Sequence, residues 1–169
     1  MIEFDLSNDI NSVINKTIQS SIEACVLCWL ATLSKNGAPN VNPKSAWLYR
    51  EDDRIWVADI ASPKTLANIR YSPKVCLSFV DALTQKGYKI VGKARILETG
   101  DEGFDEAFDK LTAYIGGKFP IPSVIEISVE LVAPIKAPKC ILLPETPESE
   151  MVQQALKSYG LEWKEDMSD

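Results

Sequence analysis

Residues 62–65, Ser-Pro-Lys-Thr, bring two hydroxyls and a cation to the point where a helix is expected to begin. Ser62 suits the N-cap, and Pro63 suits the first helical position, where its missing N–H costs nothing. The first N–H groups of a helix have no partner within it and carry a partial positive charge. Lys64 and Thr65 add donors at the same point. The spacing therefore predicts a phosphate site.

Lys64 also has a simpler interpretation, which the sequence leaves open. A cation in the first turn opposes the helix dipole by about 0.3–1 kcal/mol, and Asp or Glu is more usual there. Lysine is nevertheless a common surface residue, and an exposed Lys64 that contacts only water is compatible with the sequence.

A second cation, Lys44, lies in a predicted strand over residues 40–49. Strand alternation places Asn40, Asn42 and Lys44 on one face. Pro43 removes a donor from the ladder, which predicts an edge strand or a bulge whose free backbone groups can contact a flat heterocycle. A lysine that simply faces solvent remains the alternative for Lys44.

The charge is distributed unevenly along the chain. The net charge is −6, which argues against a nucleic-acid-binding protein. Between Lys35 and Arg95, however, 11 Lys and Arg stand against five Asp and Glu. A basic middle in an acidic protein indicates a local anion site. A chance fluctuation in surface charge is the alternative.

The chain has no histidine, which excludes Ser-His-Asp and Cys-His catalysis and most catalytic metal centres. A cofactor or carboxylates must carry any chemistry. Cys25 and Cys28 form a single CxxC with no second pair, so we expect no metal site and interpret them as buried free thiols.

Hydrophobic periodicity and turn residues divide the chain into helices and strands. Asn36-Gly37 predicts a hairpin, and Ser72-Pro73 ends the helix that begins after Ser62. Asp9 is the expected cap of a first helix. The predicted helices cover residues 9–24, 63–71, 101–117 and 151–163, and the predicted strands cover 26–34, 40–49, 54–60, 74–81, 88–98 and 123–135.

Six strands in hairpin order predict a mainly β fold with flanking helices, an antiparallel six-stranded barrel. We expect one domain over residues 1–169, with an N-terminal helix (1–24), a barrel core (24–133) and a C-terminal loop and helix (140–169). Trp29, Trp47 and Trp56 lie on strands and are expected in the core. No apolar run approaches a membrane span and no secretory signal is evident, so we expect a cytoplasmic protein without membrane contact, with residues 164–169 disordered.

The stretch VNPKSAWLYREDDRIWVADIASPKTLANIRYSPKVCLSFVD, followed by GYKIVGKARIL, resembles the FMN-binding split β-barrel family related to pyridoxamine 5′-phosphate oxidase. The resemblance covers roughly residues 24–133. It implies a homodimer with FMN at the subunit interface. It assigns the FMN phosphate to Lys64 and Thr65 with Ser62. The other implied contacts are Asn42, Pro43, Lys44 and Ser45 along the flavin and ribityl chain, the backbone of Asp59, Ile60 and Ala61 along the ring, and Asn68 either holding the helix or binding ligand.

The resemblance implies an FMN-dependent oxidoreductase, similar to a flavin reductase that uses NAD(P)H, with Lys44 providing positive charge near the reduced ring. A non-catalytic FMN-binding protein that carries electrons or stores flavin remains open. So does a barrel that binds another anion, such as a deazaflavin or haem. The family's oxidase uses Arg and His in a C-terminal extension, whereas this chain has no His and ends in ILLPETPESEMVQQALKSYGLEW, so we do not expect it to oxidise pyridoxamine phosphate.

Overall fold

The computed structural model describes residues 14–162 of the chain. Two predictions, the Asp9 cap and the disorder of residues 164–169, lie outside this range. Helix α1 (Lys16–Glu23) begins later than the predicted helix, because Asn15 is the N-cap and its side chain accepts a hydrogen bond from the Ile18 N–H at 3.0 Å. Ile18 and Ile22 form the buried face of α1.

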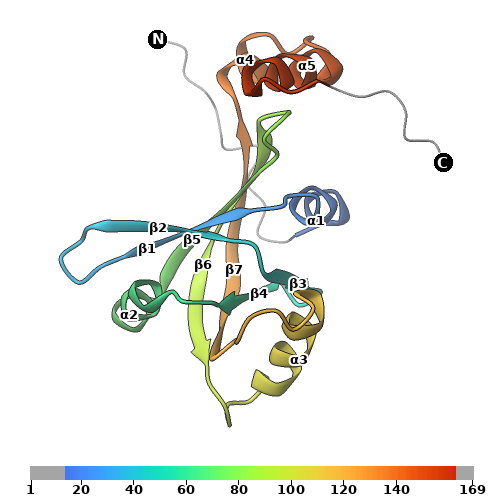
Figure 1. Cartoon of the computed structure of the whole chain (residues 1–169). Coiled ribbons are helices and arrows are strands. Elements are labelled where there is room, and N and C mark those ends of the chain that lie inside the picture. Colours follow the sequence, from blue (N-terminus) through green and yellow to red (C-terminus); the bar gives the residue numbers. More distant parts are fainter. Residues whose placement is uncertain (1–13, 163–169) are drawn as a thin grey trace.

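Seven antiparallel strands form one curled sheet, in the order β2-β1-β5-β6-β7-β4-β3 (Figure 1). This arrangement confirms the predicted mainly β fold with flanking helices, although the strand count is seven and not six. The strands are β1 (Cys28–Leu33), β2 (Pro39–Lys44), β3 (Trp47–Arg50), β4 (Arg54–Asp59), β5 (Lys74–Val80), β6 (Lys86–Leu97) and β7 (Ser123–Lys136).

The extra strand arises because the predicted strand 40–49 divides after Lys44. β2 pairs with β1 at one edge of the sheet, and β3 pairs with β4 at the other. Ala46, between them, accepts a hydrogen bond from the Ala58 N–H at 2.9 Å. Residues 40–49 have one continuous strand pattern in the sequence. β2 and β3 are distinguished only by the strands with which they pair.

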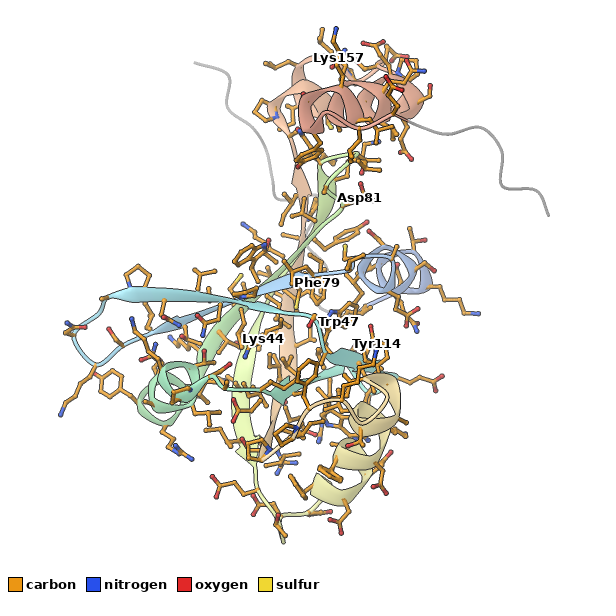
Figure 2. All side chains as sticks on the ribbon, viewed as in Figure 1. Lys44, Trp47, Phe79, Asp81, Tyr114 and Lys157 are labelled. Carbon is orange, nitrogen blue, oxygen red and sulfur yellow. The ribbon has the colours of Figure 1, made fainter. Side chains whose placement is uncertain are left out.

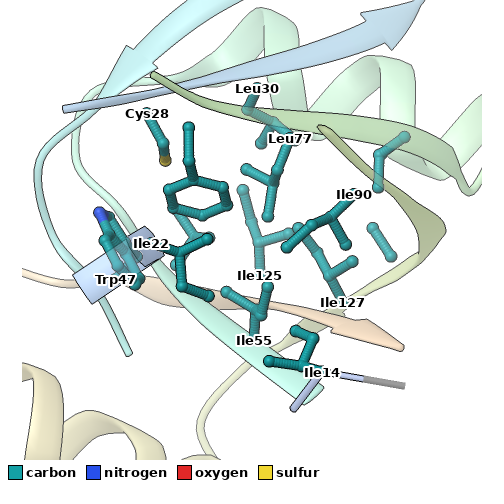
Figure 3. Packing of buried hydrophobic residues seen from close by; sticks show 14 of the residues in the cluster. Ile14, Ile22, Cys28, Leu30, Trp47, Ile55, Leu77, Ile90, Ile125 and Ile127 are labelled. Atoms are coloured by element: carbon teal, nitrogen blue, oxygen red, sulfur yellow. The ribbon is translucent and has the colours of Figure 1, made fainter. Parts of the chain in front are cut away.

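The concave side of the sheet is filled by one large apolar cluster (Figure 3). Trp47 and Phe79 meet edge to face there, with ring centroids 4.7 Å apart. Ile22 of α1 packs into the same cluster. Trp47 and Trp56 are buried as predicted, but Trp29 is 44% exposed, so its predicted place in the core is wrong. Trp29 lies in a predicted strand, as Trp47 and Trp56 do. The register of β1 in the sheet decides that its side chain lies on the exposed face.

Gly92 is required where β6 bends. The register between β6 and β7 shifts between Val91 and Gly92. A Cβ atom at Gly92 would lie 2.2 Å from the carbonyl oxygen of Ser128. The close approach of the two strands at this bulge excludes any side chain and lets the sheet curl.

Four further helices complete the described chain. They are α2 (Pro63–Tyr71), α3 (Phe104–Tyr114), α4 (Pro138–Leu142) and α5 (Glu148–Tyr159). Helix α3 covers a second, smaller apolar cluster that includes Trp56 and Leu97. Helix α4, which has only five residues, was not predicted from the sequence, and the last helix begins at Glu148 rather than at the predicted residue 151. Among the described helices, none has the length and apolar character needed to cross a bilayer.

Candidate functional site

The turn that leads from β4 into α2 is held by a buried carboxylate. Asp59, the last residue of β4, is 4% exposed. Its carboxylate accepts hydrogen bonds from the Ser62 N–H at 3.3 Å and from the Ser123 hydroxyl at 3.1 Å. Ala61, in the turn between Asp59 and Ser62, has a positive φ of 52°, which costs a non-glycine residue on the order of 1 kcal/mol. The surrounding bonds stabilise this strained turn.

Ser62 occupies the N-cap position, as predicted, with Pro63 directly after it. Its hydroxyl does not cap the helix, however, so that detail of the prediction is wrong. The hydroxyl instead accepts a hydrogen bond from the Lys44 ammonium and donates to the Ile60 carbonyl at 3.2 Å. The strand cation and the helix start are therefore joined directly.

Lys44 is buried, with 6% of its surface exposed, so it does not simply face solvent (Figure 2). Burial lowers the pKa of Lys44, and the nearby Asp59 carboxylate partly opposes that shift. The Cys28 thiol lies close to Lys44, and burial raises its pKa to about 12. Cys28 is therefore neutral at physiological pH. Cys25 and Cys28 are both free and buried, which confirms the prediction of buried free thiols.

Thr65 links the first turn of α2 to β2. It is fully buried, and its hydroxyl accepts a hydrogen bond from the Asn42 side-chain amide at 2.8 Å. Asn42 and Lys44 thus reach α2 from the same face of β2, as alternation predicts. We call the group Asn42, Lys44, Asp59, Ser62 and Thr65 the α2 cluster.

Asn68 lies one turn further along α2. Its buried amide donates to the Thr32 hydroxyl of β1 at 2.9 Å. This bond holds α2 against the sheet.

The remaining predicted residues surround the α2 cluster, and of their groups the Ile60 carbonyl accepts a hydrogen bond from Ser62. Lys64 is exposed on the first turn of α2. The others are half-buried Ile60 and exposed Pro43, Ser45 and Ala61. Pro43 lies in β2, which is an edge strand of the sheet as predicted.

Ser123 is the member of the site that sequence reasoning missed. It is the first residue of β7 and lies opposite Asp59 in the β4–β7 register. The two residues are 64 positions apart in the chain. A serine at the start of a strand carries no local signal, so only the strand pairing identifies it.

A second polar cluster lies elsewhere, on the face of the sheet near α3. Glu126 of β7 is 2% exposed and accepts hydrogen bonds from the Trp56 indole at 2.9 Å and from Arg95 at 2.7 Å. Arg54 donates to it at 3.2 Å, and Arg50 lies 3.9 Å away. We call these residues the Glu126 cluster. Apart from Trp56, these residues line a cavity of about 620 Å³, which Asp52, Glu102 and Glu106 also line.

Burial by itself raises the pKa of Glu126. The hydrogen bonds from Trp56 and Arg95, with the charges of Arg95 and Arg54, outweigh burial and hold the pKa below its usual range. The carboxylate is consequently ionised and satisfied at neutral pH. The positive and negative groups around the cavity nearly balance, so the Glu126 cluster has no excess of positive charge.

A curled antiparallel sheet with flanking helices defines the class of protein: a split β-barrel. Residues 14–138 match the family model described as pyridoxamine 5′-phosphate oxidase, and the chain belongs to this family. Curated protein sequences give no match.

Several solved structures are similar to the chain. HupZ from Group A Streptococcus is 26% identical, with a TM-score of 0.60 over 70% of this chain and 92% of that protein. An FMN-binding protein from Syntrophomonas wolfei is 20% identical, with a TM-score of 0.62 over 71% and 84%. HutZ, the heme storage protein from Vibrio cholerae, is 14% identical, with a TM-score of 0.59 over 73% and 97%.

The donor set of the α2 cluster fits a phosphate ester. An ammonium, two hydroxyls and the first amides of a helix are the groups that bind phosphate oxygens. Lys44 is held at the helix start by Ser62, and exposed Lys64 lies on the same turn. Both oxygens of the buried Asp59 carboxylate accept hydrogen bonds from Ser62 and Ser123, and the nearby Lys44 partly balances its charge.

Proposed function

We propose that the chain binds FMN at the start of α2 and is an FMN-dependent oxidoreductase, similar to a flavin reductase. The observation that carries the proposal is the hydrogen bond from the buried Lys44 ammonium to Ser62. A buried cation at a helix N-terminus is costly unless an anion completes the site. The family match and the FMN-binding protein among the similar structures support the same ligand.

The residues around the α2 cluster have distinct roles in this proposal. Lys64, Ser62 and Thr65 bind the phosphate. Asn42, Pro43, Lys44 and Ser45 line the ribityl chain and the flavin, and the backbone of Asp59, Ile60 and Ala61 runs along the ring. Asn68 keeps α2 on the sheet through Thr32. Bound FMN supplies hydride and electron transfer, while the protein supplies position and charge.

Lys44 lies nearer to the proposed phosphate position than expected from the sequence, which placed it along the flavin and ribityl chain. Its ammonium is bonded to Ser62, on the turn that carries Lys64. We therefore assign it to orienting the phosphate and the adjoining ribityl oxygens. Its charge still contributes a positive potential along the flavin, since the buried environment screens it weakly.

A non-catalytic FMN-binding protein, which carries electrons or stores flavin, is the second candidate. One observation favours it: the side chains of the α2 cluster are engaged with one another, through the Asn42–Thr65, Lys44–Ser62 and Asp59–Ser123 bonds. Such an arrangement suits binding more than proton transfer. Both candidates include a homodimer with FMN at the subunit interface.

Flavin titration tests the binding proposal. We expect the purified protein to take up FMN with the yellow absorption of a flavoprotein and to bind riboflavin, which lacks the phosphate, at least about tenfold more weakly. A protein that takes up neither flavin would overturn the proposal. Consumption of NADH or NADPH with excess FMN then separates the candidates, because absence of turnover with every acceptor leaves only the binding protein.

A further inference from the structure

The side chains assigned to the phosphate come from two separate elements. Lys44 lies in β2. The start of α2 carries Ser62, Lys64 and Thr65. β2 is an edge strand whose one partner in the described sheet is β1. A binding site keeps its affinity only while its donors stay within about 0.5 Å of the productive geometry, so the fold must hold β2 in a fixed position relative to α2.

Thr32 of β1 is hydrogen-bonded to both of these elements. Its hydroxyl oxygen accepts a bond from the Asn68 side-chain amide of α2 at 2.9 Å and a longer one from the Asn40 side-chain amide of β2 at 3.4 Å. Asn40 lies directly opposite Thr32 in the β1–β2 register. Thr32 and Asn68 are both buried, so water competes little for their bond. One buried oxygen thus links β1, β2 and α2, and Figure 1 shows α2 beside the β1–β2 hairpin.

A second bond between asparagine and threonine lies nearer to the proposed phosphate position. The Asn42 amide of β2 donates to the Thr65 hydroxyl of α2 at 2.8 Å. Thr65 and Asn68 are three positions apart in α2, so they lie on the same side of the helix. The two bonds therefore hold α2 against the β1–β2 hairpin at two points. We call Thr32, Asn42, Thr65 and Asn68 the Asn–Thr clamp.

We propose that Thr32 is a positioning residue for the phosphate of FMN, because it holds the first turns of α2 at the strand that carries Lys44. Thr32 acts through Asn68 and Asn40 and not by contact with the ligand. The clamp also prepares Thr65, since a hydroxyl that accepts an amide keeps its own proton for a phosphate oxygen. The inference rests on the proposed function and extends it to a residue outside the α2 cluster.

Thr32→Val in the full chain tests the proposal, because valine has nearly the shape of threonine but lacks the oxygen that accepts both amides. We expect FMN to bind at least about fivefold more weakly and riboflavin to bind nearly as before, since only FMN uses the donors that the clamp aligns. Thr32→Ser restores the oxygen and should recover most of the preference for FMN. Fluorescence titration with each flavin gives the two dissociation constants.

Thr112→Val is the matched control. The Thr112 hydroxyl in α3 is also buried but has no hydrogen-bond partner within residues 14–162, so the same substitution should leave the ratio of FMN to riboflavin affinity unchanged. Urea unfolding measures the stability of each variant, and Thr32→Ala replaces Thr32→Val if the latter does not fold.

Two negative results have different meanings. A wild-type protein that binds neither flavin overturns the proposed function and this inference with it. If the wild type prefers FMN, the inference alone is overturned when Thr32→Val loses stability but keeps the wild-type ratio of affinities, which is the result that a purely structural role gives. Equal weakening of both flavins, or a Thr32→Ser variant no better than Thr32→Val, would also overturn it.

Discussion

The α2 cluster and the Glu126 cluster both bury an ion beside the sheet, but their centres have opposite charge. In the first, Lys44 is a buried cation bonded to a serine hydroxyl at a helix start. In the second, Glu126 is a buried anion with three arginines and an indole around it. In the α2 cluster, the described hydrogen-bond partner of Lys44 is an uncharged hydroxyl. In the Glu126 cluster, the carboxylate is hydrogen-bonded to charged arginines and to an indole.

The difference separates a binding site from a structural anchor. A buried charge is tolerated when ion pairs and hydrogen bonds satisfy it. Glu126 meets this condition within one copy of the chain. Within residues 14–162, the Ser62 hydroxyl is the only hydrogen-bond partner of Lys44, and Asp59 acts on Lys44 through its charge. In the proposed function, the phosphate of FMN adds a hydrogen-bonded anion. Substitutions should accordingly alter ligand affinity at one cluster and stability at the other.

The largest expected effect is on flavin affinity in Lys64→Glu. The charge reversal at the exposed first turn of α2 should weaken FMN about 100-fold and riboflavin hardly at all, because only FMN carries the phosphate. Fluorescence titration with both flavins measures the ratio. Arg70→Glu, at the other end of α2, has the same change in net charge and should leave both affinities unchanged. Equal losses of FMN and riboflavin would place the phosphate elsewhere.

Glu126→Gln should destabilise the fold by about 2 kcal/mol without changing FMN affinity, because it leaves the arginines without their buried counter-charge. Partial exposure of those arginines keeps the loss below that of a fully buried pair. The pKa of Glu126 is lowered in the folded state. Its stabilisation is therefore present above the pKa of an unfolded glutamate and is lost as pH falls through the lower folded value.

Urea unfolding of wild type and Glu126→Gln at several acidic pH values checks this prediction. The difference between the two proteins should shrink as pH falls. Glu130→Gln, which breaks an exposed ion pair with Lys93, is the matched control on the same strand and should change stability little. A difference that stays constant down to low pH would show that the charge of Glu126 does not stabilise the fold.

Lys44→Met should reduce the preference for FMN over riboflavin about tenfold at neutral pH. Since burial lowers the pKa of Lys44, the wild-type preference should decline as pH rises through that lowered value. The Met variant should lack this decline. Flavin titrations between about pH 7 and pH 10, where the phosphate remains dianionic, compare the two profiles. Identical profiles would remove Lys44 from phosphate binding.

The smallest expected effect belongs to Ser123→Ala, which removes one hydrogen bond from Asp59. We expect a loss of about 1 kcal/mol in stability and a few-fold loss of FMN affinity, because the Ser62 turn becomes less fixed. Ser128→Ala, at an exposed position of the same strand, should affect neither. If Ser123→Ala leaves both quantities unchanged, Asp59 positions the turn without help from β7.

Much of the fold was predictable from local pattern. Alternation and turn residues located the strands, and the Ser62–Pro63 start of α2 was confirmed with the proline at the first helical position. The division of residues 40–49 into β2 and β3 was not predictable, because both halves alternate alike and differ only in the strand they pair with. The exposure of Trp29 was missed for a related reason, since a strand's pattern does not say which of its faces a partner will cover.

The sequence by itself determined the chemistry available at the site: a hydroxyl, a proline and a lysine at a helix start, a second lysine on a nearby strand, and no histidine anywhere. These are properties of residue type and short spacing. The tertiary structure alone decided that Lys44 is buried against Ser62, that Ser123 holds Asp59, and that three arginines converge on Glu126. Each of these contacts joins residues 18 or more positions apart, and such contacts depend on which strands pair when the sheet curls.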